Sequence, residues 1–331
     1  MFRSAALCAL LLVLLMGCGA SRPSPDSDDH LACDLQRFVV SDVFGGLQAH
    51  QGAQAQRAET PKEFNVLALS AGGELGVYGA GFLRGWREAG AAAHPVPLSR
   101  VHVVTAVSAG ALLATHLFIG DEPFLHEVLP QIGQDDLFGK RYFSLLWSNA
   151  FLDDAGKDRN QRETVLTSRV IDAVAKQPPG RFLYVGVTDL DSGRFLQIDM
   201  TRLSREIEPV ALRDRCYRAV IGASTAIPVL MSPKFVDNMM LSDGAVRQHV
   251  FLPVAPPQTM RPDVQRRLLV IVHSELLSAE PTGCGAVQGQ TCNGWLPIAL
   301  RTANLSASQG LQDSLRAVEQ LARQPVAGSP Y

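Results

Sequence analysis

The chain has 331 residues, of which 47% are hydrophobic, 19% are charged and 7% are aromatic. This composition is that of a globular protein and excludes a disordered or low-complexity chain. The 30 basic and 32 acidic residues give a formal charge of -2. The chain carries no polybasic run, so a nucleic-acid partner is not expected.

Residues 1–17 form an apolar segment of the kind that directs export. One cation, Arg3, precedes an apolar run that ends at Met16, which is short for a membrane span and typical of a signal-peptide core. The run leads into Gly-Cys, which resembles a bacterial lipobox. We therefore expect a lipoprotein signal peptide, cleavage before Cys18 and lipidation of that cysteine. An ordinary secretory signal, cleaved near Ala20, is the alternative.

The segment after Cys18 predicts a tethered domain. Residues 19–32 are rich in Ser, Pro and Asp, a composition typical of a flexible linker. We assign residues 18–61 to the lipidated N-terminus, tether and N-terminal extension, and residues 62–331 to one globular domain. Gly19 rather than Asp follows the cysteine, which favours the outer over the inner membrane of a bacterial cell envelope.

Four cysteines remain when the signal segment and Cys18 are set aside. An even number in an oxidising compartment favours disulfides. Cys284 and Cys292 bracket a Gly-rich loop that closes easily, so we predict a local disulfide there. Cys33 and Cys216 are then left as a second pair. The chain contains neither CxxC nor HExxH spacing, so no metal site is predicted.

Short apolar runs alternate with helical stretches through the rest of the chain. The expected strands are Phe64–Leu69, Val101–Ala106, Phe182–Thr188, Phe195–Asp199, Phe235–Leu241 and Leu268–His273. The expected helices are Val77–Ala89, Ala109–Phe118, Arg162–Lys176, Val210–Ile221 and a C-terminal helix around Ile298–Arg323. This alternation predicts an α/β domain around a largely parallel sheet. Ligands bind such sheets at the carboxyl ends of the strands.

The turn after the strand Val101–Ala106 has the form of a nucleophile elbow. Residues 106–110 read AVSAG and continue into an apolar helix. Small residues on both sides of Ser108 suit a tight turn that lifts the serine oxygen above the sheet edge, where the helix N-terminus favours an oxyanion. A serine that caps a core helix is the alternative interpretation.

A glycine-rich turn follows the strand Phe64–Leu69. Residues 69–76 read LSAGGELG, so glycines at 72, 73 and 76 leave backbone N–H groups without side-chain shielding. An acyl hydrolase needs such donors for the oxyanion of its tetrahedral intermediate. Neither GxGxxG nor GK[ST] occurs in this turn, so no dinucleotide or P-loop nucleotide is expected as a cofactor.

A carboxylate follows the run Phe235–Leu241. Residues 242–245 read SDGA, and Asp243 is suited to act as the general base that a serine nucleophile needs. Asp-Gly is also a common turn dipeptide, so a plain turn is the alternative.

Four segments, taken together, resemble the patatin-like phospholipases. ALSAGGELGVYGAGFLRGW, TAVSAGALLATHLF, GASTAIPVLM and SDGAVRQHVFLPV occur in that order, within about residues 64–255. The resemblance implies a three-layer α/β/α fold with a central, mostly parallel sheet in residues 62–331. It also implies a Ser-Asp dyad without histidine, in which Ser108 is the nucleophile and Asp243 its partner. The implied reaction is hydrolysis of acyl esters of lipids, without a cofactor.

The resemblance also places an oxyanion hole in the glycine-rich turn. Its donors would be the backbone N–H groups of Gly72, Gly73 and Gly76, to which the elbow would add that of Ala109. Three positions depart from the family pattern: Ala71, Leu75 and Ala106. Leu75 stands where the family commonly has Arg or Lys, which removes a positive charge beside the loop.

We therefore predict a membrane-anchored carboxylic ester hydrolase of the phospholipase A or lysophospholipase kind. Its partners would be a lipid or ester substrate and, through the lipid on Cys18, a membrane. Two alternatives stay open. One is a triad esterase that uses Ser108, Asp243 and His273, since His273 ends an apolar run. The other is a lipid-binding lipoprotein of the same fold that is weakly active or inactive.

Overall fold

The structure, a computed structural model, describes most of the expected globular domain and part of the N-terminal extension. The described residues are 22, 30–42, 63–73, 76–93, 96–121, 124, 139–140, 152–153, 165–228, 230–252, 265–274, 291 and 294–323. Several sequence predictions fall outside them: the signal peptide of residues 1–17, the lipidated Cys18, the Cys284–Cys292 disulfide and the departure at Leu75.

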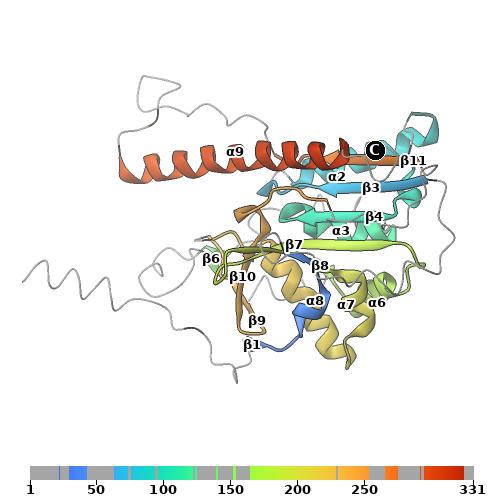
Figure 1. The fold of residues 1–331 in the computed structure, drawn as a ribbon, viewed down its shortest axis with the longest axis horizontal. Helices are drawn as coiled ribbons and strands as arrows, with labels where there is room; N and C mark the ends of the chain where they lie inside the picture. The colour runs from blue at the N-terminus through green and yellow to red at the C-terminus, as the bar shows by residue number, and fades with distance from the viewer. Residues whose placement is uncertain are drawn as a thin grey trace, which may run out of the picture.

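Nine strands of the described residues form one sheet (Figure 1). Its order is β1 (His30–Leu31), β9 (Lys234–Val236), β10 (Met239–Asp243), β7 (Phe182–Asp189), β4 (Val103–Val107), β3 (Glu63–Leu69) and β11 (Gln265–Ile271). In addition, β8 (Arg194–Asp199) pairs with β7, and β2 (Val39–Asp42) pairs with β8. The neighbours β7, β4, β3 and β11 are parallel, while β10 and β8 run antiparallel to β7. A separate hairpin joins β5 (Gly139–Lys140) to β6 (Leu152–Asp153).

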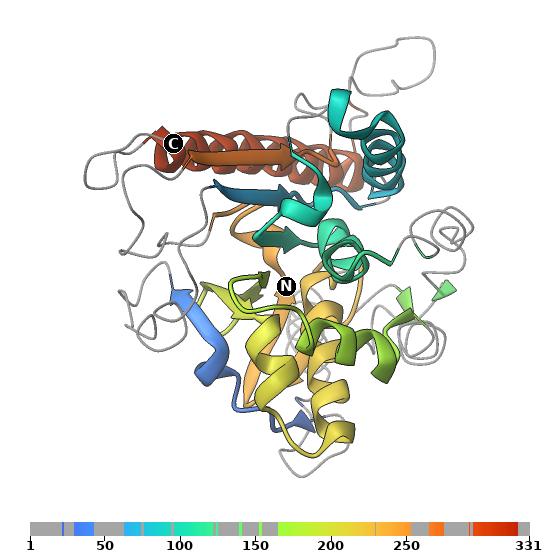
Figure 2. The same ribbon diagram turned by 90° about the vertical axis from the view of Figure 1, so that its right-hand side faces the viewer.

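Helices cover both faces of this sheet. They are α2 (Gly76–Ala93), α3 (Ala109–Ile119), α6 (Ser168–Ala175), α7 (Met200–Glu206), α8 (Val210–Ser224) and α9 (Trp295–Arg323). In β3, Leu67 and Leu69 pack into the core cluster that contains α3 and α8, while Val66 and Ala68 pack into the cluster that contains Val318 of α9. Figure 2 shows α9 lying along β11, with α8 toward the other edge of the sheet. Strands covered on both faces are expected to be mostly apolar, as β3 is. The sheet and its flanking helices confirm the predicted mixed α/β fold with a central, mostly parallel sheet.

The segment Phe235–Leu241 is a hairpin rather than the single strand that its apolar run predicts. Strands β9 and β10 are antiparallel and are joined through Asp237 and Asn238, whose φ angles are 49° and 64°. Asp and Asn tolerate this left-handed conformation better than other non-glycine residues. The Asp-Asn pair is therefore a turn signal that the apolar run around it obscures.

Two helices differ from the sequence prediction at their first turns. Within the described part of the expected helix Arg162–Lys176, α6 begins only at Ser168, with the Thr167 hydroxyl as its N-cap. Helix α7 was not predicted, since it follows β8 without a loop. There Asp199 closes the strand and also caps the helix, accepting the backbone N–H of Arg202 at 2.9 Å.

The N-terminal extension is fastened to the far edge of the sheet. Cys33 and Cys216 form a disulfide, which confirms the second of the two cysteine pairs that the sequence suggests. Beside it, the carboxylate of Asp237 accepts the backbone N–H groups of Cys33 at 2.7 Å, Asp34 at 3.0 Å and Leu35 at 2.5 Å. The extension therefore belongs to the folded domain, and it joins that domain through residues nearly two hundred positions away.

We expect removal of this disulfide to destabilise the domain. Replacing both Cys33 and Cys216 by alanine releases a cross-link that spans 183 residues, which should cost about 2–5 kcal/mol of unfolding free energy. Urea denaturation followed by circular dichroism measures the loss. Wild type in a reducing agent should match the double variant, and an unchanged midpoint in both would contradict the prediction.

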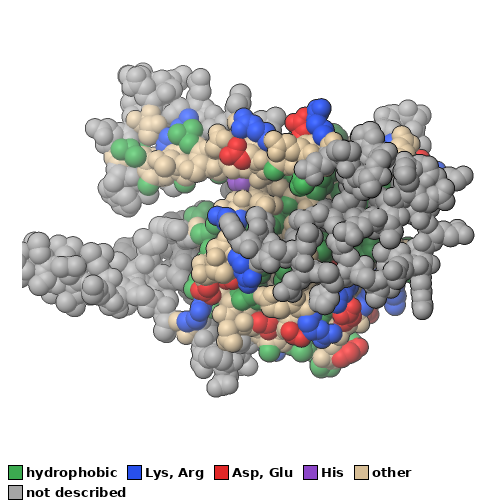
Figure 3. Space-filling model, in the orientation of Figure 1, with side chains coloured by type: hydrophobic (Ala, Val, Ile, Leu, Met, Phe, Trp, Pro, Cys, Tyr) green, Lys and Arg blue, Asp and Glu red, His purple; other side chains and the backbone are tan. Residues whose placement is uncertain are grey.

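On the described part of the face drawn in Figure 3, charged side chains of both signs are interspersed, including those of the C-terminal half of α9. This distribution agrees with the near-neutral net charge and does not form a single-sign surface on that face. Among the described residues, no helix combines the length and the apolar character that crossing a bilayer requires.

Candidate active site

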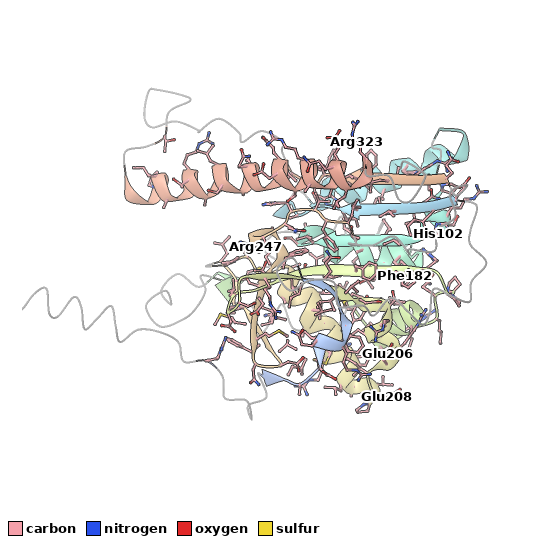
Figure 4. The ribbon with its side chains drawn as sticks, viewed as in Figure 1. His102, Phe182, Glu206, Glu208, Arg247 and Arg323 are labelled. Atoms are coloured by element: carbon pink, nitrogen blue, oxygen red, sulfur yellow. A yellow bond between two sulfur atoms is a disulfide. The ribbon has the colours of Figure 1, made fainter. Side chains whose placement is uncertain are left out.

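The two turns singled out by the sequence lie side by side at the carboxyl ends of β3 and β4. These strands are parallel neighbours, with Leu69 paired to Ala106, so the chain leaves both at the same edge of the sheet. Figure 4 marks the two ends: His102 and Phe182 lie at the amino ends of β4 and β7, and Arg247 lies toward the opposite end. The position agrees with the general rule for ligand sites in such sheets.

Ser108 occupies a strained turn between β4 and α3. Its φ is 55° and its ψ is -123°, a conformation that non-glycine residues rarely adopt and that clusters at functional sites. Gly110 makes the turn possible, because a Cβ there would lie 2.8 Å from the carbonyl oxygens of both Leu69 and Ser70. Glycine at 110 is thus required by the close approach of the elbow to the glycine-rich turn.

Alanine at Gly110 should therefore damage the elbow. The added methyl group has backbone oxygens as neighbours, which cannot move aside as a flexible side chain can, so we expect a loss of about 1–3 kcal/mol in unfolding free energy and reduced activity. Gly85 of α2 is the matched control, since a Cβ there meets no atom within 4 Å. Gly85→Ala should stabilise the protein by up to about 1 kcal/mol. Equal thermal melts for the two variants would contradict this account.

Ser108 and Asp243 are in direct contact. The Oγ of Ser108 donates a hydrogen bond of 2.6 Å to Oδ2 of Asp243. Both residues are nearly withdrawn from solvent, with exposed fractions of 4% for Ser108 and 2% for Asp243. The pair predicted from two segments 135 residues apart is therefore brought together by the fold. Such a serine–carboxylate contact is the arrangement that activates a serine nucleophile.

Asp243 reaches Ser108 across the intervening strand β7. Residue 243 ends β10 and is followed by the 3-10 helix η6 (Gly244–Val246). A Cβ on Gly244 would lie 2.6 Å from the carbonyl oxygen of Gly186 in β7 and 2.9 Å from the Val107 side chain. Glycine at 244 thus lets the Asp-Gly turn press against β7 and β4. Residues 242–245 therefore form a turn, as the plain-turn interpretation expects, and this turn also carries the carboxylate that contacts Ser108.

Burial sets the proton affinity of Asp243. Loss of solvent raises the pKa of its carboxyl to about 7, while hydrogen bonds from the Ser108 hydroxyl and the Ala245 backbone N–H act in the opposite direction. The Ala245 bond is made to Oδ1 at 2.8 Å, so each carboxyl oxygen has one partner. A carboxyl with this pKa changes its charge close to neutral pH, as suits a general base.

Ser224 supports the elbow from the end of α8, and the sequence analysis gave it no role. Its hydroxyl accepts the backbone N–H of Ser108 at 3.0 Å and donates to the carbonyl oxygen of Gly186 at 2.7 Å. The Ser108 N–H is therefore occupied and is not an oxyanion donor. The only sequence signal was that Ser224 falls in the segment GASTAIPVLM, one of the four that carry the family resemblance.

The predicted oxyanion donors lie in the two turns and at the first residues of the helices that follow them. Gly72 and Gly73 form the turn after β3, with a φ of 54° at Gly73, and Gly76 is the first residue of α2. Ala109 is the first residue of α3. Among the residues that the structure describes, none accepts a hydrogen bond from the N–H groups of Gly72, Gly73 or Ala109.

The alternative chemistries raised by the sequence are not assembled within the described residues. The ring Nδ1 of His273 lies 2.7 Å from the carbonyl oxygen of Ser70, and both oxygens of Asp243 are taken by Ser108 and Ala245. The structure therefore does not join His273 to the Ser–Asp pair. The described part of the chain also contains no group of three or more His, Cys, Asp or Glu side chains placed to hold a metal ion.

Comparison with known proteins identifies a family for most of the sheet and both turns. A family model described as "Patatin-like phospholipase" matches residues 67–256 of the chain, while no curated protein matches. A similar solved structure is that of VipD from Legionella pneumophila, with 12% sequence identity and a TM-score of 0.36. The alignment covers 64% of this chain and 50% of VipD, so the chain spans half the length of that neighbour.

Proposed function

The chain belongs to the patatin-like phospholipase family, and we propose that it is a serine acyl hydrolase that cleaves carboxylic esters of lipids. One observation carries the proposal: the 2.6 Å hydrogen bond from the Ser108 hydroxyl to the buried carboxyl of Asp243, in a strained turn at the sheet edge. A capping serine would point its hydroxyl at its own helix, but no side-chain cap is formed at Ser108.

In the proposed reaction, Asp243 accepts the proton of the Ser108 hydroxyl while the serine oxygen attacks the ester carbonyl carbon. The negative charge that develops on the carbonyl oxygen is held by the N–H groups of Gly72, Gly73 and Ala109. Collapse of this intermediate breaks the bond to the alcohol, which leaves with the proton from Asp243. Water, deprotonated by the same carboxylate, then hydrolyses the acyl-enzyme and releases the fatty acid.

Fatty-acid release from defined lipids tests the proposed activity. Purified protein is mixed with vesicles of a diacylphospholipid, with a lysophospholipid and with a short-chain ester, and a fluorophosphonate probe is added in parallel. We expect labelling by the probe and release of fatty acid from at least one lipid. Wild type that neither hydrolyses any of them nor takes up the probe would favour the inactive lipid-binding alternative.

We also propose that the enzyme is attached to the outer membrane of a bacterial cell envelope through lipid on Cys18. The support is the lipobox-like end of the signal segment, and the absence of a polybasic run that would bind anionic lipid instead. One acyl chain anchors a protein only marginally, whereas the several chains of a lipoprotein cysteine hold it firmly. Cys18→Ser should therefore move the protein from the membrane to the soluble fraction after cell lysis. Unchanged fractionation would contradict the anchor.

A further inference from the structure

His273 is buried against the glycine-rich turn rather than beside the Ser–Asp pair. Only 1% of its surface is exposed. A Cβ on Gly72 would lie 2.1 Å from the His273 carbonyl oxygen and 2.4 Å from its Cβ. A Cβ on Gly79 of α2 would lie 2.0 Å from its ring Nε2. The histidine is thus wedged between the turn and the helix that follows it, and both positions require glycine.

Hydrogen bonds tie His273 to Ser70, two residues before Gly72. The ring Nδ1 donates to the Ser70 carbonyl oxygen at 2.7 Å, because a carbonyl can only accept. The His273 backbone N–H donates to the Ser70 hydroxyl at 2.8 Å, and that hydroxyl donates to the carbonyl oxygen of Ala71 at 2.7 Å. The ring of His273 therefore holds the Ser70 carbonyl directly, and its backbone N–H holds the Ser70 hydroxyl that in turn holds the Ala71 carbonyl.

These bonds fix the direction of the first oxyanion donor. In a trans peptide the C=O and the N–H point in opposite directions. The peptide between Ser70 and Ala71 is held at both ends. Its carbonyl oxygen accepts from the His273 ring, and its N–H donates to the carbonyl oxygen of His249 at 2.7 Å. In the next peptide, the Ala71 carbonyl is held by the Ser70 hydroxyl, so the N–H of Gly72 must point the other way.

The ring is held as a neutral imidazole. With its proton on Nδ1, its Nε2 carries a lone pair, and within the described residues that buried atom has no hydrogen-bond partner. Burial also lowers the pKa of His273. A buried nitrogen without a partner is unfavourable, and an apolar side chain of similar size would fill the space without that cost. The Nδ1 bond to Ser70 is the contact that only a donor side chain can supply.

We propose that His273 is a positioning residue, which orients the oxyanion-hole N–H of Gly72 through Ser70. The inference rests on the proposed acyl hydrolase function, and it gives His273 a role different from that of a triad base. Oxyanion donors must lie about 2.7–3.1 Å from the developing charge, and loss of one typically costs about 100- to 1,000-fold in rate. Without the hydrogen bonds to the Ser70 and Ala71 carbonyl groups, the turn would not hold the Gly72 N–H at that distance from the developing charge.

Two substitutions at His273 and one control separate positioning from packing. His273→Leu keeps an apolar body without a donor, while His273→Asn places an amide N–H near the position of Nδ1. His116 is the matched control, because it is also 1% exposed and its Nδ1 lies 2.9 Å from Asp121 at the far end of α3. His116→Leu should lower the melting temperature but leave kcat unchanged at a temperature where the protein is folded.

We expect His273→Leu to lower kcat by about 100-fold with little change in KM. The kcat of His273→Asn should be only about 10-fold below that of wild type. The affinity for a trifluoromethyl ketone, whose adduct with serine carries an oxyanion, should fall in parallel with kcat/KM. If His273→Leu does not fold, Ser70→Ala removes the hydroxyl that joins the His273 backbone N–H to the Ala71 carbonyl, and it should lower kcat at least about 10-fold.

Three results would overturn the proposal. If wild type is active and His273→Leu is equally active, the contact with Ser70 has no catalytic effect. Where His273→Leu does not fold, an equally active Ser70→Ala leads to the same conclusion. A loss of about 10,000-fold in both His273→Leu and His273→Asn would indicate a catalytic base instead. If His116→Leu lost as much ketone affinity and kcat as His273→Leu, the losses would come from general loosening of the fold. Wild type without hydrolysis or labelling would instead refute the proposed function itself.

Discussion

Replacement of Ser108 by alanine is expected to reduce ester hydrolysis by at least about 1,000-fold and to abolish fluorophosphonate labelling. The serine oxygen is the atom that bonds to the substrate, and alanine leaves nothing to form the acyl-enzyme. The hydrogen bond to Asp243 is lost as well, but the elbow should still fold, because Ser224 holds the backbone N–H of residue 108 rather than its side chain. Fatty-acid release, measured at several enzyme concentrations, gives the size of the loss.

The control for this change is a serine of the same chain outside the site. Ser306 lies exposed on α9, so Ser306→Ala should retain full hydrolysis and full labelling. Circular dichroism should give the same spectrum for wild type and both variants. If Ser108→Ala retained more than a tenth of the wild-type rate with its fold intact, the nucleophile would have to be another residue.

The second large effect is expected at Asp243. Asp243→Asn removes the proton acceptor while keeping the size of the side chain, so kcat should fall by about 100- to 10,000-fold. Because the base works only when ionised and burial raises its pKa to about 7, wild-type activity should rise with pH through neutrality. A pH profile of kcat/KM between pH 5 and 9 measures this. A flat wild-type profile would contradict the assignment of Asp243 as base.

The same residue should limit stability. A carboxyl with a folded-state pKa near 7 and an unfolded-state pKa of about 3.9 binds its proton more tightly when folded. Stability should therefore decrease as the pH rises from about 4 to 7, by up to a few kcal/mol, and stay reduced above that. Asparagine at 243 does not ionise, so its stability does not fall in this range. The difference in melting temperature between Asp243→Asn and wild type should therefore increase in favour of the variant from pH 5 to pH 8. A constant difference would contradict this linkage.

The parts of the fold that the sequence predicts best are those set by local pattern. Strands β3 and β4 are largely apolar because both faces are covered, and the apolar runs predict their bounds to within two residues. The elbow is also local, since strand, small residues around Ser108 and apolar helix are contiguous in the chain. For this reason the sequence alone predicts that the two turns lie at one edge of the sheet.

Features that depend on distant contacts were not accessible in this way. Ser224 holds the elbow from 116 residues away, and nothing in its own neighbourhood marks it as a hydrogen-bond partner of Ser108. The sequence predicts the Cys33–Cys216 disulfide only as the pair that remains after Cys284 and Cys292. The carboxylate of Asp237, which holds the N-terminal extension beside this disulfide, comes from a turn that the surrounding apolar run obscures.

His273 illustrates how position in sequence can suggest the wrong partner. It follows β11, at the same edge of the sheet as Ser108, which made a catalytic triad a reasonable alternative. Strand β11 pairs with β3 and is thus two strands away from β4, so the histidine meets the turn after β3 instead. Sheet order, which a single sequence does not reveal, places His273 against the turn after β3 rather than beside Ser108 and Asp243.

The central claim is that Ser108 becomes covalently acylated, and peptide mapping of the labelled protein tests it most directly. Trypsin should release residues 101–140 as one peptide, in which Ser108 is the only serine. After reaction with a fluorophosphonate, we expect the mass increment on this peptide alone, placed at Ser108 by fragmentation, and its absence in Ser108→Ala. An increment on a different peptide, or none on a protein that hydrolyses lipid esters, would contradict the mechanism.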